Sequence, residues 1–222
     1  PENQDEAELL DIFKTIEEIL EKESGPFYLF DLHTTSSKTI PFITVNDSLL
    51  NRKFTELYPL PLVLGIEEYL DGPMLSYYNE KGYVSFGFEG GEHYSDTAIE
   101  NHKAFIYLTL VFCGLIDRSA IEYEAYWNQL ASQSKGVEHF YEIYHRFAIT
   151  ADDEFKMKAG YENFRPISKG EALAHFNSEM IVADHSSIIF MPLYQSTGSD
   201  GFFLIKQTKA FFLRLSTWFR KM

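Results

Sequence analysis

The sequence predicts an α/β domain followed by a small β-rich domain, and three patterns indicate this arrangement. Helix and strand patterns alternate through residues 1–134. Short strand patterns between turn residues fill residues 135–207, and an amphipathic tail occupies residues 208–222. The chain has 222 residues, of which 45% are hydrophobic and 16% aromatic, so it can bury a sizeable core.

The first elements are a helix and a strand. Asn3 and Glu6 have the spacing of a capping pair at the start of a helix that runs to about Lys22. Its apolar residues recur with helical spacing, at Leu9, Ile12, Phe13, Ile16, Ile19 and Leu20. The turn residues 24–26 end this helix, and the aromatic residues of 27–32 then predict a strand.

Further strands and helices follow in alternation. Strand patterns occur at 39–45, 61–66 and 83–88. Polar residues at 46–48 favour the start of a short helix that ends near Phe54, and Ser95 favours the start of a long helix to about Leu115. Residues 119–132 predict another helix. We expect the amphipathic tail to dock on the domain rather than on a membrane surface.

Charge and composition exclude several classes of protein. The chain carries 33 acidic and 19 basic residues, a formal net charge of −14, which repels the phosphates of nucleic acids. The longest apolar run, at 108–116, is too short to span a membrane. The single cysteine, Cys113, can form no disulfide within the chain. We therefore expect a cytoplasmic protein without nucleic-acid or membrane partners; no pattern specifies an oligomeric state.

The stretch DLHTTSS places polar residues at the end of a predicted strand. Because side chains two residues apart on a strand point to the same side, Asp31 and His33 are expected on one face. Ligands tend to bind at such strand ends in α/β proteins. A histidine there can coordinate a metal while a carboxylate holds its other ring nitrogen. The alternative is a hydrogen-bonded structural histidine at the edge of a loop.

A second polar cluster follows the strand at 83–88, in the stretch GYVSFGFEGGEHYSD. Glu89 ends an apolar run and meets Gly90 and Gly91, which allow a tight turn and the close approach of another group. A carboxylate at this position is a candidate general base. Glu92 and His93 come next. The alternative is a glycine turn that carries solvated charges.

The stretches DLHTTSS and FEGGEHYSDTAIENHKAF together resemble the succinylglutamate desuccinylase/aspartoacylase family of zinc amidohydrolases. The later stretches YENFRPISKGEALA and IIFMPLYQSTGSDGFFL resemble its carboxyl-terminal β-domain, and the resemblance covers most of residues 27–205. It implies a zinc-carboxypeptidase-like fold, in which a layered mixed sheet with helices is followed by a small β-rich domain. Residues 1–134 would then be the carboxyl-terminal part of the zinc-hydrolase domain.

The resemblance also implies roles for individual residues. His33 matches the family's third zinc ligand and Glu89 its catalytic glutamate, while Asp31 would orient His33. The cofactor would be Zn²⁺, and the substrate a small N-acyl amino acid or a related amide. Other residues are expected to line the substrate pocket: Thr34, Thr35, Ser36, Tyr77, Tyr78 and Asn79.

Two departures from the family pattern accompany these expectations. The family's first two zinc ligands, in a Gly-x-His-Gly-x-Glu type motif, and its Asp-Leu-Asn-Arg motif are absent from these 222 residues. We expect the gene to encode them upstream of Pro1; Glu92 and His93 are the alternative ligands within the chain. Aspartoacylase-like members also carry an arginine about ten residues before the catalytic glutamate, where Asn79 stands here.

Two other functions stay open on the sequence. The chain could be a non-catalytic module that keeps the fold and binds a ligand or partner without metal. It could also be a carboxypeptidase-like peptidase, because the fold alone does not separate classes of amide substrate.

Overall fold

The computed structural model describes residues 3–69 and 74–208. In this part of the chain, eight strands form a mixed sheet in the order β1-β4-β2-β3-β5-β11-β10-β7, and a second sheet has the order β6-β8-β9. The strands are β1 (Tyr28–Thr35), β2 (Phe42–Val45), β3 (Leu62–Leu64), β4 (Val84–Glu92), β5 (Phe140–Ala148), β6 (Phe155–Met157), β7 (Arg165–Ile167), β8 (Ala172–Phe176), β9 (Glu179–Val182), β10 (Ser187–Phe190) and β11 (Asp200–Gln207).

Helices precede and connect these strands. They are α1 (Gln4–Lys22), α2 (Leu49–Thr55), α3 (Met74–Glu80), α4 (Asp96–Phe112) and α5 (Tyr123–Gln133), with short 3-10 helices η1 (Ile66–Glu68) and η2 (Arg118–Ala120). No helix within the described ranges has both the length and the apolar character needed to cross a membrane. Of the tail expected at 208–222, only Thr208 lies within the described residues.

The predicted helix starts follow local capping chemistry. The side chain of Asn3 accepts a hydrogen bond from the Glu6 amide at 2.9 Å, and that of Ser48 accepts one from the Asn51 amide at 3.2 Å. The helix expected at 119–132 divides in two. Asp117 caps η2, and the extended backbone of Ile121 separates η2 from α5.

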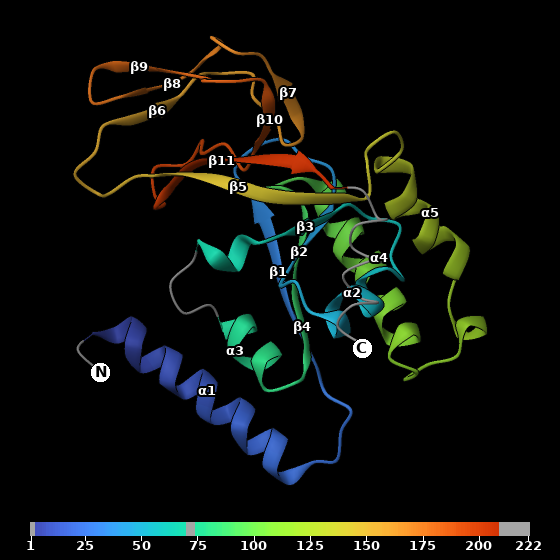
Figure 1. The fold of residues 1–222 in the computed structure, drawn as a ribbon. Helices are drawn as coiled ribbons and strands as arrows, with labels where there is room; N and C mark the ends of the chain where they lie inside the picture. The colour runs from blue at the N-terminus through green and yellow to red at the C-terminus, as the bar shows by residue number, and fades with distance from the viewer. Residues whose placement is uncertain (1–2, 70–73, 209–222) are drawn as a thin grey trace, which may run out of the picture.

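The large sheet crosses the domain boundary expected at residue 134. Strand β5 pairs in parallel with β3 and antiparallel with β11, so it joins the amino-terminal strands to the β-rich segment. The segment after 134 therefore contributes β5, β11, β10 and β7 to the same sheet, while β6, β8 and β9 form the separate one (Figure 1). The change in sequence texture at this point reflects the loss of helices and not the end of the sheet.

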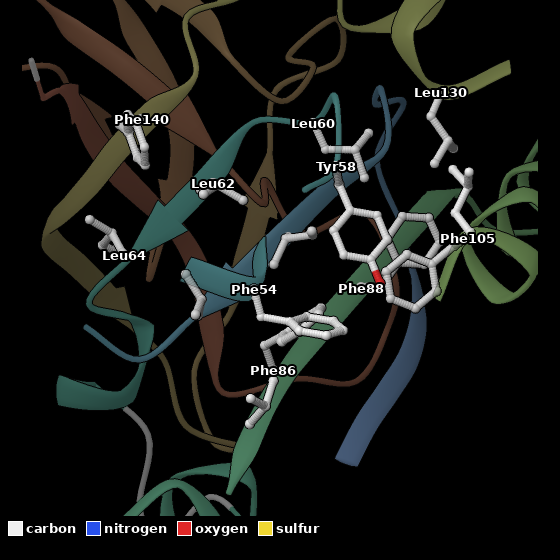
Figure 2. Packing of buried hydrophobic residues seen from close by; sticks show 14 of the residues in the cluster. Phe54, Tyr58, Leu60, Leu62, Leu64, Phe86, Phe88, Phe105, Leu130 and Phe140 are labelled. Carbon is white, nitrogen blue, oxygen red and sulfur yellow. The ribbon is translucent and has the colours of Figure 1, made fainter. Parts of the chain in front are cut away.

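Helices α2, α4 and α5 gather on one side of the amino-terminal strands (Figure 1). Between them and the sheet lies an aromatic core, in which the Phe88 and Phe105 rings stack 4.1 Å apart and the Tyr58 hydroxyl bonds Thr109 Oγ1 at 2.6 Å (Figure 2). Each large side chain buried here contributes about 1.5–3 kcal/mol to folding. This core fixes the orientation of β4, and β4 in turn positions the candidate site on its other face.

Candidate active site

Strands β1 and β4 lie side by side in parallel, and this pairing assembles the site. Their register sets His33 opposite Glu89 and Asp31 opposite Gly87. Because side chains alternate along a strand, Glu89 points away from the helix-facing residues Phe86 and Phe88. A cavity of about 380 Å³ lies here, and its lining includes Asp31, His33 and Glu89.

Asp31 and His33 form a pair on the rim of this cavity. The imidazole Nε2 donates to Asp31 Oδ2 at 2.8 Å, and both side chains are about half exposed. This hydrogen bond holds the pKa of Asp31 below and the pKa of His33 above their ordinary values. With Nε2 engaged, Nδ1 is the ring nitrogen of His33 that could coordinate a metal.

Glu89 is in a very different environment, because its residue is only 8% exposed. Its Oε2 atom is buried and has no hydrogen-bond partner within residues 3–69 and 74–208. Burial raises the pKa of this carboxyl to about 7. A buried acceptor without a partner costs about 1–3 kcal/mol. Such an atom points to a polar group that binds at this position, such as water or substrate.

At two glycines near Glu89, side chains from neighbouring elements occupy the space that a Cβ would need. A Cβ at Gly87 would stand 2.5 Å from Oγ1 of Thr44, and a Cβ at Gly90 would stand 2.1 Å from the His102 ring. Strand β4 continues through Gly90 and Gly91 to Glu92, with an irregularity in its pairing with β1 between His33 and Thr35, so the predicted tight turn does not follow Glu89 directly. Strand β1 likewise continues past His33 through Thr35.

Thr34, Thr35 and Ser36 line a second cavity of about 310 Å³, and His33 lines both cavities. Thr34 Oγ1 shares a hydrogen bond of 2.7 Å with His93 Nδ1. Ser36 Oγ accepts one from the Tyr194 amide at 3.1 Å. These three residues therefore lie beside His33, as the sequence predicts, and their part in substrate binding stays a prediction.

Tyr77, Tyr78 and Asn79 are not among the residues that line these two cavities, and their part in substrate binding stays a prediction. They belong to α3, a helix that the sequence pattern did not reveal. Tyr78 is fully buried and stacks with Phe13 of α1, while Asn79 Nδ2 donates to the Tyr83 carbonyl at 3.0 Å. The cavity is instead lined by the residues at the start of α3: Met74, Leu75 and Ser76.

Glu92 and His93 are not brought together as metal ligands. Glu92 is exposed and lines neither cavity, and the second ring nitrogen of His93 bonds Gln195 Oε1 at 3.1 Å. No group of three His, Cys, Asp or Glu side chains in the described part of the chain could hold a metal ion. Catalytic zinc usually needs three protein ligands. The described residues therefore do not complete a zinc site around His33.

The cavity is also lined by residues that no sequence pattern singled out. Asn46 Nδ2 donates to Ser76 Oγ at 2.7 Å, and Glu67 and Asp200 line the same cavity. The stretch 46–48 is recognisable as a helix start but not as part of a pocket. Glu67 and Asp200 come from a 3-10 helix and from β11, and only the folded sheet brings them near Glu89.

No protein-family model matches this sequence, and no curated protein matches it. Among solved structures, a succinylglutamate desuccinylase/aspartoacylase from Rhodobacter sphaeroides is similar, with a TM-score of 0.56 and 14% identity over 82% of this chain and 58% of that one. A succinylglutamate desuccinylase from Vibrio parahaemolyticus has a TM-score of 0.57 and 15% identity over 94% of this chain and 62% of that one. The product-bound ectoine utilization protein EutE from Ruegeria pomeroyi has a TM-score of 0.55 and 14% identity over 80% and 57%.

The chain has the mixed α/β fold of the succinylglutamate desuccinylase/aspartoacylase structures, and this confirms the fold that the sequence resemblance implied. It spans 57–62% of the length of these three structures. At 14–15% identity the likeness establishes the fold and not the activity.

Proposed function

We propose that this chain forms part of an amide hydrolase that acts on N-acyl amino acids or related amides. The observation that carries the proposal is Glu89, a buried carboxylate in a cavity that it shares with His33, one of whose oxygens has no partner among the described residues. The names of the similar structures from Rhodobacter sphaeroides and Vibrio parahaemolyticus support the reaction class.

In the proposed reaction Glu89 is the general base. Its carboxylate takes a proton from water, and the oxygen of that water forms a bond to the carbonyl carbon of the amide. Glu89 then passes the proton to the nitrogen as the carbon–nitrogen bond breaks, which releases a carboxylate and an amine. A pKa raised to about 7 by burial suits both transfers near neutral pH.

We also propose Zn²⁺ as the cofactor of the whole protein, with His33 as one ligand and Asp31 as the residue that orients its ring. Bound zinc would polarise the amide carbonyl and lower the pKa of water. Two further ligands would have to come from residues outside the described ranges, since these ranges hold no group of three donors. The proton transfers themselves need only Glu89.

The test is an assay of the whole protein with a panel of N-succinyl, N-acetyl and N-aspartyl amides, together with metal analysis after dialysis. We expect release of the free amine and about one zinc per protein. The 222-residue chain alone should hold far less than one zinc and release no amine. Absence of hydrolysis by the whole protein over the panel would refute the proposed reaction, and turnover by the metal-free whole protein would refute the role of zinc.

A second candidate is a non-catalytic binding module with the same fold, since residues 3–69 and 74–208 hold no group of three metal donors. Such a module would bind small amides in the cavity of about 380 Å³ without hydrolysing them. Calorimetry with the same panel distinguishes the module from the hydrolase. The module would bind an amide and leave its concentration unchanged over hours, whereas the hydrolase would consume it.

A further inference from the structure

The helix layer carries an apolar strip that the described residues leave only partly covered. The strip runs from the residues just after α2 to α5 and consists of Leu57, Phe112, Tyr123 and Trp127. Leu57 is 41% exposed, and the other three pack against the aromatic core with part of their surface in solvent. The Tyr123 and Trp127 rings stack with centroids 6.0 Å apart, and the Phe112 ring lies 6.4 Å from Tyr123. The Tyr58 ring, next to Leu57 in sequence, lies 4.8 Å from Phe112 and makes the strip continuous.

The last described residue, Thr208, lies close to the α2 end of this strip. Its amide donates to the Phe140 carbonyl at 3.0 Å, at the start of β5. Burial lowers the pKa of the adjacent His139, and the negative charge of Glu56 opposes this shift, so Glu56 at the carboxyl end of α2 lies nearby. Helix α2 also packs against β2, which is two strands from β5 in the sheet, or about 10 Å at the usual strand spacing. Residues 209–222 therefore begin beside the strip.

The sequence of residues 209–222 has the pattern of an amphipathic helix. Large apolar residues recur at spacings of three, four and seven, which a helix would place on one face: Phe211, Phe212, Leu215, Trp218, Phe219 and Met222. A helix of this length measures about 21 Å, enough to pass from Thr208 over α2 toward α4 and α5. Isolated helices this short are marginal in water, so the pattern requires a surface on which to pack.

The charges of the two surfaces are complementary. Residues 209–222 include four basic side chains and no acidic one: Lys209, Arg214, Arg220 and Lys221. Exposed carboxylates stand next to the strip in sequence, at Glu56 and Glu122, while a third, Glu124, is paired with Arg118. The whole chain has a formal net charge of −14, so the acidic excess lies entirely outside this basic segment. Attraction between opposite charges therefore favours an approach of the segment to the rest of the chain.

We propose that residues 209–222 form a helix that docks its apolar face on the apolar strip of the same chain. The docking would remove Leu57 and the rings of the strip from water, and the basic side chains would meet the carboxylates beside it. It does not depend on the proposed function, because the strip lies on the helix side of the sheet and the cavity of Glu89 on the other side. A second copy of the chain and an anionic membrane are the rival occupants, and the experiment distinguishes them.

The test is limited trypsin digestion of the whole protein at low concentration, with cleavage after Lys209 and Arg214 followed by mass spectrometry. Docking should protect both bonds, since a protease cuts the segment only when it opens. Leu57→Asp should speed this cleavage at least ~10-fold by weakening the docked state. Ile99→Asp is the matched control, because it adds the same charge at a side chain of α4 that is 65% exposed and outside the strip, and it should leave the rate unchanged. Circular dichroism checks that each variant keeps its fold.

A second variant changes the docking segment itself. Trp218→Asp should speed cleavage by a similar factor, and the double variant with Leu57→Asp should gain little more, because the two side chains belong to one contact. Effects that multiply in the double variant would overturn the inference. So would wild-type cleavage as fast as that of a free peptide of residues 206–222. Protection that rises with protein concentration would assign the strip to a second copy, and protection that requires anionic vesicles would assign the segment to a membrane; either result refutes docking within the chain.

Discussion

Strand β4 turns Phe86 and Phe88 toward the helices and Gly87 and Glu89 toward the cavity. On the first face every buried ring contacts other rings, and Phe88 is completely buried in the aromatic core. On the second face the carboxyl group of Glu89 is buried almost as deeply, and one of its oxygens has no partner in the part of the chain that the structure describes. One strand thus carries a surface that stabilises the fold and a surface that costs stability.

Two carboxylates of the site, Asp31 and Glu89, also differ in burial and in hydrogen bonding. Asp31 is half exposed and hydrogen-bonded to the imidazole, which lowers its pKa. Glu89 is buried, which raises its pKa to about 7, and its Oε2 has no hydrogen-bond partner among the described residues. Environments that push the pKa values of two acids apart give the two acids different chemical roles. Asp31 stays ionised as a partner of His33, and Glu89 is able to exchange a proton.

The largest expected effect on stability comes from a substitution in the aromatic core, on the helix-facing side of β4. Phe88→Ala should lower the free energy of unfolding by ~3–5 kcal/mol, because it leaves a cavity in the packed core. Urea denaturation followed by far-UV circular dichroism measures this. The control Ile99→Ala alters a side chain on α4 that is 65% exposed and should cost under ~0.5 kcal/mol. A loss below ~1 kcal/mol for Phe88→Ala would show that this core is not well packed.

A substitution of Glu89, on the opposite face of β4, should raise the free energy of unfolding instead of lowering it. The pKa of Glu89 is higher in the folded than in the unfolded state, so its contribution to stability is lost as pH rises from about 4.5 to about 7. Glu89→Gln should therefore match the wild type near pH 4 and exceed it by ~3 kcal/mol at pH 8. Denaturation at both pH values, with chelator present, measures the difference. A difference that does not depend on pH would contradict the raised pKa.

Catalysis by the whole protein should fall in the same variant. Glu89→Gln preserves the shape of the side chain but cannot accept the proton, so hydrolysis should drop by at least ~100-fold while the zinc content is unchanged. Steady-state kinetics and metal analysis check both statements. Glu92→Gln, on the same strand but exposed and outside both cavities, should keep its activity. Near-wild-type turnover in Glu89→Gln would remove Glu89 from the mechanism.

The smallest expected effect concerns the half-exposed pair of Asp31 and His33. The hydrogen bond from Asp31 raises the pKa of His33, so Asp31→Asn should bring that pKa down toward its ordinary value near ~6.5. A titration of the His33 ring by nuclear magnetic resonance measures the change, and Glu92→Gln serves again as control. The same pKa in Asp31→Asn and in the wild type would mean that the 2.8 Å contact does not govern His33.

Much of the local structure could be predicted from the sequence alone. The cap at Asn3, the strand that carries Asp31 and His33 on one face, and the strand that delivers Glu89 all follow from residue type and spacing within a few positions. Such features depend on backbone hydrogen bonding and on the two-residue period of a strand. The family resemblance extended this to the fold, because it rests on the order of these same short stretches.

Only the tertiary structure decided which residues meet. Tyr78 is buried against α1 instead of facing the pocket, β5 joins the sheet across the expected domain boundary, and Glu67 lies in the cavity of Glu89. None of these follows from neighbours in sequence, because each depends on how strands distant along the chain pair and twist. The sequence determined that a histidine and two acids stand on two strands; the sheet order that pairs these strands, and the burial that it produces, decided that they meet, their ionisation and their partners.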